Sequence, residues 1–286
     1  MHGILSGLDK IGITGMSNMD IYGDPGKNGE EDSTGKLPGT WFSEAVEKDF
    51  LYDKSHSCPV CHNEFKTPTV RANKLRPMGA DYDLRPRFEG IDPLKYEVVM
   101  CHECGYAALG NYFDKMTVAQ AGLIREGITK HYKKFDATST FTYDQAFLRY
   151  QLALGNAVIK RSKASEKAYL CLKMAWLLRG KKEAIDGGVL EYEPGKYADT
   201  IREIEVMQKE LLGNAIEGFI KAKQSEAFPI CGIDRTTLDY IIAAEAVNVE
   251  DYVLALQILN DLIKKPGISK EMEQRCHALM IRIKDT

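Results

Sequence analysis

Two pairs of closely spaced cysteines are the residues in this sequence whose chemistry is easiest to predict. Cys58 and Cys61 form one C-x-x-C pair, and Cys101 and Cys104 form a second. Each pair can form a knuckle, a tight turn that directs two thiolates toward one point. Four thiolates in a tetrahedral arrangement are the ligands that Zn²⁺ prefers in a closed structural site. The spacing therefore predicts that these four cysteines hold a structural Zn²⁺.

The spacing between the pairs and the residues beside them leave alternatives open. The pairs are separated by 39 residues, more than the usual spacing of about 15–20, which we attribute to an inserted loop over residues 76–93. Four thiolates also suit a single iron, so a rubredoxin-like redox protein, or a metal or thiol sensor, is the first alternative to zinc. The run CPVCH (58–62) matches a c-type haem attachment motif, but haem would leave the second pair without a role.

The rest of the chain shows no recognisable catalytic site. Three further cysteines, Cys171, Cys231 and Cys276, stand alone in apolar or helical contexts, where cysteine usually packs as a small hydrophobic residue. The sequence contains no G-x-S-x-G motif, no H-E-x-x-H motif and no pair of carboxylates with a catalytic spacing. We therefore expect a protein that is not an enzyme.

The elements that must position the cysteines lie in three regions. Residues 1–40 are expected to form a flexible segment, because Gly23–Lys36 is rich in Gly and acidic residues and almost lacks apolar side chains. The apolar residues near the N-terminus predict either a frayed end or a short docking element. Residues 41–115 are expected to form a region like a zinc ribbon, with strands over Phe65–Arg71 and Lys95–Met100, whose β-branched and aromatic content favours strands.

Residues 116–286 are expected to form an antiparallel helical array. Thr117 and Thr142 are each followed three residues later by Gln, which is the capping-box pattern of a helix start. Gly180 and the Pro266-Gly267 pair are expected to end helices. The predicted helices span residues 117–134, 142–161, 165–180, 197–224, 236–248, 250–264 and 269–284. The fold class is therefore α+β, mainly α.

The segment Thr236–Gly267 has the pattern of a tetratricopeptide (TPR) repeat. Small residues occur where two helices would cross, large apolar residues follow them, and a proline lies near the end. Helices stacked in this way present a groove to a peptide or protein. In this register Tyr240 and Asn248 would face the groove, so we expect them to contact a partner.

The charge distribution argues for a protein partner over nucleic acid. The chain has a net charge of −3, and residues 56–107 carry seven Lys or Arg against seven Asp or Glu. Nucleic-acid affinity depends on cations that no carboxylate compensates. The inserted loop and its surroundings contain Arg71, Arg76, Arg85 and Arg87, so a nucleic-acid-binding ribbon is the second alternative. The other interpretation of this loop is an ion-paired segment packed against the helices.

Composition and segment lengths indicate a cytosolic protein. Hydrophobic residues make up 44% of the chain, enough for a sizeable core. No apolar run approaches the about 18 residues that span a bilayer, and the first residues do not resemble an export signal. Cytosolic thiols stay reduced, so we expect the clustered cysteines to hold a metal and not to form disulfides.

With these residues in view, the chain resembles the bacterial DUF2225 family over about Trp41 to Lys284. The resemblance implies a zinc-ribbon-like N-terminal region, metal ligation by the four cysteines and a TPR-like helical remainder, but no reaction. One departure is His62, because relatives often have glycine there. The resembling segments are CPVCHNEF, the VRANKLR that follows, DYDLRPRFEGIDPLKYEVVMCHECGYAA and FPICGIDRTTLDYIIAAE.

These observations together predict a cytosolic, non-enzymatic adaptor. A structural Cys₄ zinc site would hold the ribbon, and the helical domain would bind a protein or peptide. The two alternatives above, iron redox or sensing and nucleic-acid binding, use the same cysteines and the same arginines.

Overall fold

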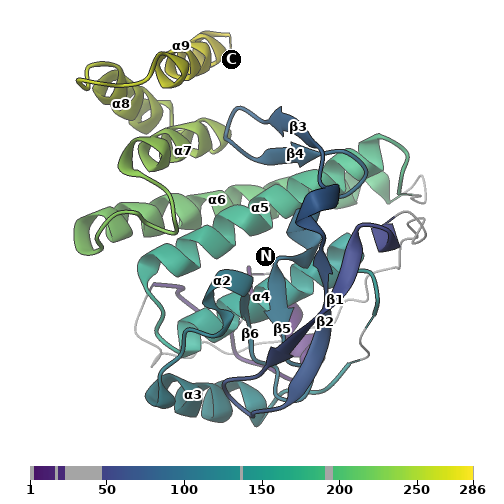
Figure 1. The fold of residues 1–286 in the computed structure, drawn as a ribbon. Helices are drawn as coiled ribbons and strands as arrows, with labels where there is room; N and C mark the ends of the chain where they lie inside the picture. Colours follow the sequence, from purple (N-terminus) through teal and green to yellow (C-terminus); the bar gives the residue numbers. More distant parts are fainter. Residues whose placement is uncertain (1–2, 17–18, 23–46, 136–137, 191–195, 286) are drawn as a thin grey trace.

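The computed structural model describes residues 3–16, 19–22, 47–135, 138–190 and 196–285. Short strands come first along the chain and long helices follow, so the fold is α+β and mainly α, as the sequence predicts (Figure 1). Helices α5 and α6 cross the middle of the molecule, and α7 to α9 extend from one end of that pair (Figure 1). Across the described residues, no helix is both long enough and apolar enough to cross a lipid bilayer.

The strands form three separate two-stranded antiparallel sheets, each between strands that are neighbours in sequence. The sheets pair β1 (Leu51–Ser57) with β2 (Glu64–Val70), β3 (Pro77–Ala80) with β4 (Pro86–Phe88), and β5 (Val98–Met100) with β6 (Ala107–Leu109). The second of these sheets lies inside the segment expected to be an irregular loop. The pairing register of that hairpin shifts between Pro77, which pairs with Phe88, and Gly79, which pairs with Arg87.

The helices confirm the predicted array, and successive helices from α4 to α9 pack against one another. Both predicted capping boxes are present, at Thr117 and Thr142. The helices are α2 (Gly110–Phe113), α3 (Val118–Ile124), α4 (Tyr143–Ile159), α5 (Ala164–Asp186), α6 (Tyr197–Ser225), α7 (Arg235–Asn248), α8 (Tyr252–Ile263) and α9 (Lys270–Lys284). Shorter turns are η1 (Ser6–Ile11), η2 (Ala72–Lys74), η3 (Pro93–Tyr96) and the π-turn η4 (Arg125–Thr129).

Gly180 does not end a helix, so that prediction is wrong. Helix α5 continues through it to Asp186. A Cβ atom at Gly180 would lie 2.6 Å from Asp92 Oδ2 and 2.9 Å from Arg85 Nη2. Since real Cβ atoms do not approach other atoms so closely, glycine is required here for the close approach of the inserted loop.

The N-terminal segment packs against the helices. Its apolar side chains are buried at Ile4, Leu5, Leu8, Ile11, Ile13, Met16 and Ile21. The Nε2 atom of Gln151 in α4 donates to the Ile4 carbonyl at 2.6 Å, and a Cβ atom at Gly155 would lie 2.9 Å from Leu8 Cδ1. Of the two interpretations of these apolar residues, this packing agrees with a short docking element and not with a frayed end. The acidic stretch Gly23–Lys36 lies outside the described residues.

Candidate metal centre

The four cysteines predicted as ligands meet at the tips of two hairpins. Cys58 and Cys61 lie in the turn between β1 and β2, and Cys101 and Cys104 lie between β5 and β6. The Sγ atoms of Cys58 and Cys104 are 3.5 Å apart, those of Cys61 and Cys101 are 3.6 Å apart, and all four lie within 4.8 Å of one another. Sulfur atoms at the corners of a Zn–S tetrahedron are separated by about 3.8 Å. The cluster can therefore hold a metal ion.

The two knuckles have the same backbone geometry. The amide of His62 donates to the Cys58 carbonyl at 2.9 Å, and the amide of Gly105 donates to the Cys101 carbonyl at 3.0 Å. Both closing residues have a left-handed backbone, with φ of 61° at His62 and 73° at Gly105. Histidine is among the residues that adopt this conformation more readily. The first knuckle therefore closes in the same way as the second, although it lacks glycine.

Burial and proton sharing suit the cluster to a cation. Cys58, Cys101 and Cys104 are buried, whereas Cys61 is exposed. Hydrogen bonds from the thiols of Cys104 and Cys58 lower the pKa of Cys101 to about 2. The same sharing of protons with Cys101 raises the pKa of Cys58 to about 12. One thiolate is thus already favoured, and a dication would displace the remaining protons because it stabilises all four thiolates.

Side chains from the helices hold the two knuckles in place. Arg125 donates from Nη2 and Nε to the Val60 carbonyl inside the first knuckle, at 2.8 and 3.1 Å. Thr129 Oγ1 donates to the Cys104 carbonyl at 3.0 Å, and Asn156 Nδ2 donates to the next carbonyl along the chain at 3.1 Å. Sequence reasoning missed these residues, since no local pattern links them to the cysteines. They fix both turns to η4 and α4.

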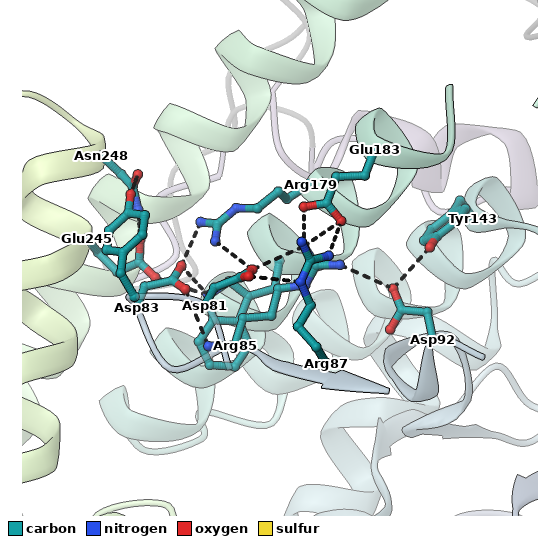
Figure 2. Close-up of polar contacts among 12 residues, drawn as sticks. Asp81, Asp83, Arg85, Arg87, Asp92, Tyr143, Arg179, Glu183, Glu245 and Asn248 are labelled. Carbon is teal, nitrogen blue, oxygen red and sulfur yellow. Dashed lines mark hydrogen bonds and ion pairs between the residues drawn. The ribbon is translucent and has the colours of Figure 1, made fainter. Parts of the chain in front are cut away.

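The inserted loop holds a second cluster of polar side chains, packed against α5 and α7 (Figure 2). Arg85 is 4% exposed, and its guanidinium lies 3.1 Å from Glu183 and 3.8 Å from Asp92. Arg87 pairs with Asp81 at 2.8 Å and also with Glu183. Of the two interpretations of the loop, the ion-paired segment packed against the helices is therefore confirmed.

The other two arginines of the nucleic-acid alternative lie apart from this cluster. Arg71 donates from Nε to the Leu51 carbonyl at 3.0 Å and stacks over the Tyr52 ring. Arg76 is exposed, with Glu89 3.8 Å away. In the described part of the chain, the four predicted arginines therefore do not form a single surface of uncompensated cations. Nucleic-acid binding gains no support from this arrangement.

A buried pair of carboxyl groups lies where the inserted loop meets α7, with Asp83 on the loop and Glu245 on the helix. Trp176 Nε1 donates to both, at 3.0 Å to Asp83 and 3.1 Å to Glu245. Arg179 Nη2 lies 2.6 Å from Asp83. Burial alone would raise the pKa of Asp83, but the Arg179 guanidinium outweighs it and holds that pKa below its ordinary value. Burial, reinforced by the charge of Asp83, raises the pKa of Glu245 well above its ordinary value.

The two residues predicted to contact a partner face this loop. Tyr240 is 1% exposed, and its hydroxyl donates to the Tyr82 carbonyl at 2.7 Å. The hydroxyl of Tyr82 donates to Asn248 Oδ1, and Arg282 of α9 lies 4.2 Å from the centre of the Tyr82 ring. The contacts of residues 81–92 with α5, α7 and α9 are called the insertion clasp below. It occupies the two side chains that we expected to be open to a partner.

Comparison with known proteins supports the resemblance noted in the sequence. A family model described as "Uncharacterized protein conserved in bacteria (DUF2225)" matches residues 51–285. No curated protein and no solved structure matched the chain. The matched range contains both cysteine pairs, the inserted loop and helices α2 to α9, and it leaves the N-terminal segment outside.

Proposed function

The chain belongs to the DUF2225 family of bacterial proteins, and from that premise we propose that it is a zinc-binding adaptor without catalytic activity. The observation that carries the proposal is the set of four Sγ atoms within 4.8 Å of one another. Cys58, Cys61, Cys101 and Cys104 would each supply one thiolate to Zn²⁺. The ion would fasten two hairpins that no strand pairing joins.

A structural role follows from the ligand set. Four protein thiolates complete the tetrahedral coordination of zinc and leave no position for water or substrate. Zinc is also inert to oxidation and reduction, so the bound ion would stabilise the fold and carry out no reaction. A single iron suits the same four sulfur atoms, and the identity of the metal decides between the adaptor and an electron carrier.

The adaptor part of the proposal rests on the helical array. Helix α8 packs against both α7 and α9, and α7 also contacts α9. Contacts of this kind between successive helices are what a TPR-like stack requires. Tyr240 and Asn248 would contact a partner only after Tyr82 leaves them, so partner binding would compete with the insertion clasp. Val253 in α8 and Ile281 in α9 are 81% and 59% exposed and offer apolar contacts without any rearrangement.

Elemental analysis of the reduced full-length protein tests the metal site. One zinc per chain supports the proposal. One iron per chain would contradict the zinc adaptor and favour a redox protein. Protein that contains neither metal, and that takes up neither when it is added, would overturn the metal site.

Affinity capture from the native host tests the adaptor part. We expect the wild-type protein to retain a specific protein, and Tyr82→Ala to retain more of it, because the variant frees Tyr240 and Asn248. Folded, metal-loaded protein that captures nothing in either form would contradict the adaptor.

A further inference from the structure

A cavity of about 360 Å³ lies where the first hairpin meets the helical part of the protein. Its lining comes from β1 and β2, from η3, from β5 and β6, from the start of α2 and from α5. Neither the four cysteines nor residues 81–92 take part in this lining. The volume falls within the range of small-molecule sites, roughly 300–1,000 Å³. The metal centre and the insertion clasp leave this cavity without an assigned role.

The cavity contains a fixed pair of opposite charges. The ammonium of Lys173 lies 2.7 Å from Glu97 Oε2, and the Lys173 side chain is 9% exposed. This ammonium also lies 4.7 Å from the centre of the Tyr169 ring. The positive charge of the ammonium and the negative charge of the carboxylate cancel, and each group is the ionic partner of the other away from bulk water. It therefore supplies polar groups to the cavity without adding a net charge.

Aromatic and aliphatic side chains form much of the wall. Three tyrosines line the cavity, Tyr96, Tyr112 and Tyr169, together with Val99 and Leu109. Tyrosine rings pack well against another planar ring and keep a hydroxyl for a polar contact. A ligand that carries a ring would therefore gain more from this wall than a flexible chain would.

Lys54 gives the cavity a net positive charge. It is an exposed residue on β1, and no carboxylate of the described residues pairs with it. With the Lys173–Glu97 pair neutral, Lys54 is the one lining Lys or Arg whose charge no lining carboxylate balances. A single uncompensated lysine beside the tyrosine rings favours a ligand with one negative charge.

Gly110 leaves part of the space open. A Cβ atom at this position would meet only the Glu97 carbonyl oxygen and Val99 Cγ2, both at 3.8 Å, which is ordinary van der Waals contact. Both neighbours belong to residues that line the cavity. A larger side chain at Gly110 would therefore extend along the cavity wall and take up the room that a ligand needs.

We propose that this cavity binds a small organic anion that carries a planar ring. The ring would pack against the tyrosines, and its carboxylate or phosphate group would pair with Lys54. This small-molecule site goes beyond the zinc-binding adaptor and does not depend on which metal the cysteines hold. Since β1 and α5 both line the cavity, a bound ligand would also strengthen the contact between the ribbon and the helices.

Titration of the full-length, metal-loaded protein tests the proposal with 2-naphthoate and with its neutral analogue 2-naphthamide. We expect 2-naphthoate to bind about fivefold more tightly, which is the affinity ratio that an exposed ion pair of about 1 kcal/mol provides. Naphthyl phosphate, titrated in parallel, shows whether the site prefers a carboxylate or a phosphate group. Equal affinity for the naphthoate and the naphthamide, or no binding of any of the three, would overturn the proposal.

Three variants locate the binding. Lys54→Gln should abolish the preference for the anion and leave the affinity for the amide unchanged. Lys66→Gln, on the same hairpin but outside the lining, is the matched control and should retain the preference. Gly110→Leu should abolish binding of both compounds while metal content and helical circular dichroism stay at the wild-type level. Unchanged binding in both Lys54→Gln and Gly110→Leu would place the ligand elsewhere and contradict the proposal.

Discussion

The metal centre and the insertion clasp solve the same structural problem with different chemistry. Each joins segments that lie far apart in the sequence. The cysteine cluster connects two hairpin tips, and the clasp connects the inserted loop to α5 and α7 (Figure 2). Four thiolates would need a bound ion to neutralise them, whereas the clasp contains both positive and negative side chains.

The difference predicts different sensitivities for the two regions. A thiolate site fails when a chelator removes the metal or an oxidant modifies the sulfur. A buried ion pair fails when one partner is removed or changes its protonation state. Removal of the metal should therefore affect the cysteine cluster and spare the clasp. Loss of a charged partner, or a change in its protonation, should affect the clasp and spare the cysteine cluster.

The largest expected effect is that of Cys101→Ser on the metal centre. The substitution removes one of four ligands, so we expect loss of stoichiometric metal, with a stability loss of up to about 10 kcal/mol. Elemental analysis measures the metal, and hydrogen exchange should show loss of protection in β1, β2, β5 and β6 while α5 keeps its protection. Cys231→Ser is the control, because Cys231 lies outside the cluster. Full metal content in Cys101→Ser would refute the four-thiolate site.

A smaller effect is expected from Arg179→Met in the clasp. Asp83 is fully buried, and Arg179 is its closest cation at 2.6 Å. Loss of one partner strands the other charge, which costs about 3–5 kcal/mol. Denaturant unfolding should show this loss at unchanged metal content. Arg76→Ala, at an exposed pair, should cost less than about 1 kcal/mol, and similar losses in the two variants would argue against the clasp.

The smallest effect, and the one most dependent on pH, is expected from Glu245→Gln. Because burial raises the folded-state pKa of Glu245 above its ordinary value of 4.5, the folded protein favours the protonated form. Wild-type stability should therefore fall as the pH rises above about 4.5 and should level off above the folded-state pKa. Glutamine resembles the protonated form, so the stability of the variant relative to wild type should increase as the pH rises above about 4.5. Unfolding curves from pH 4 to 8 measure this difference, and parallel curves would contradict a raised pKa of Glu245 in the folded protein.

Local patterns in the sequence were enough to predict most elements. The capping boxes at Thr117 and Thr142 mark the observed starts of α3 and α4, because a cap is formed within four consecutive residues. Each cysteine pair was predicted to form a knuckle for a related reason. The turn that directs each pair needs only its own neighbouring residues, as the matching backbone at His62 and Gly105 shows.

The inserted loop shows where local patterns stop being informative. Its charged residues allowed two interpretations, a cationic ribbon or an ion-paired segment. Residue types alone do not distinguish between them. Arg85 is neutralised by Glu183, which is 98 residues away in the sequence. The partner that decides whether a charge is free or paired lies on another element, and only folding brings the two together.

The sequence by itself determined the candidate metal ligands, the approximate positions of most helices and the order of strands before helices. These features arise from spacing and periodicity over a few residues to a few turns. Only the tertiary structure decided that Gly180 lies inside a helix, where it admits Asp92, and that Tyr240 is buried beneath Tyr82. The physical reason is that close approach and burial depend on which surfaces meet, and residues far apart in the chain make those surfaces.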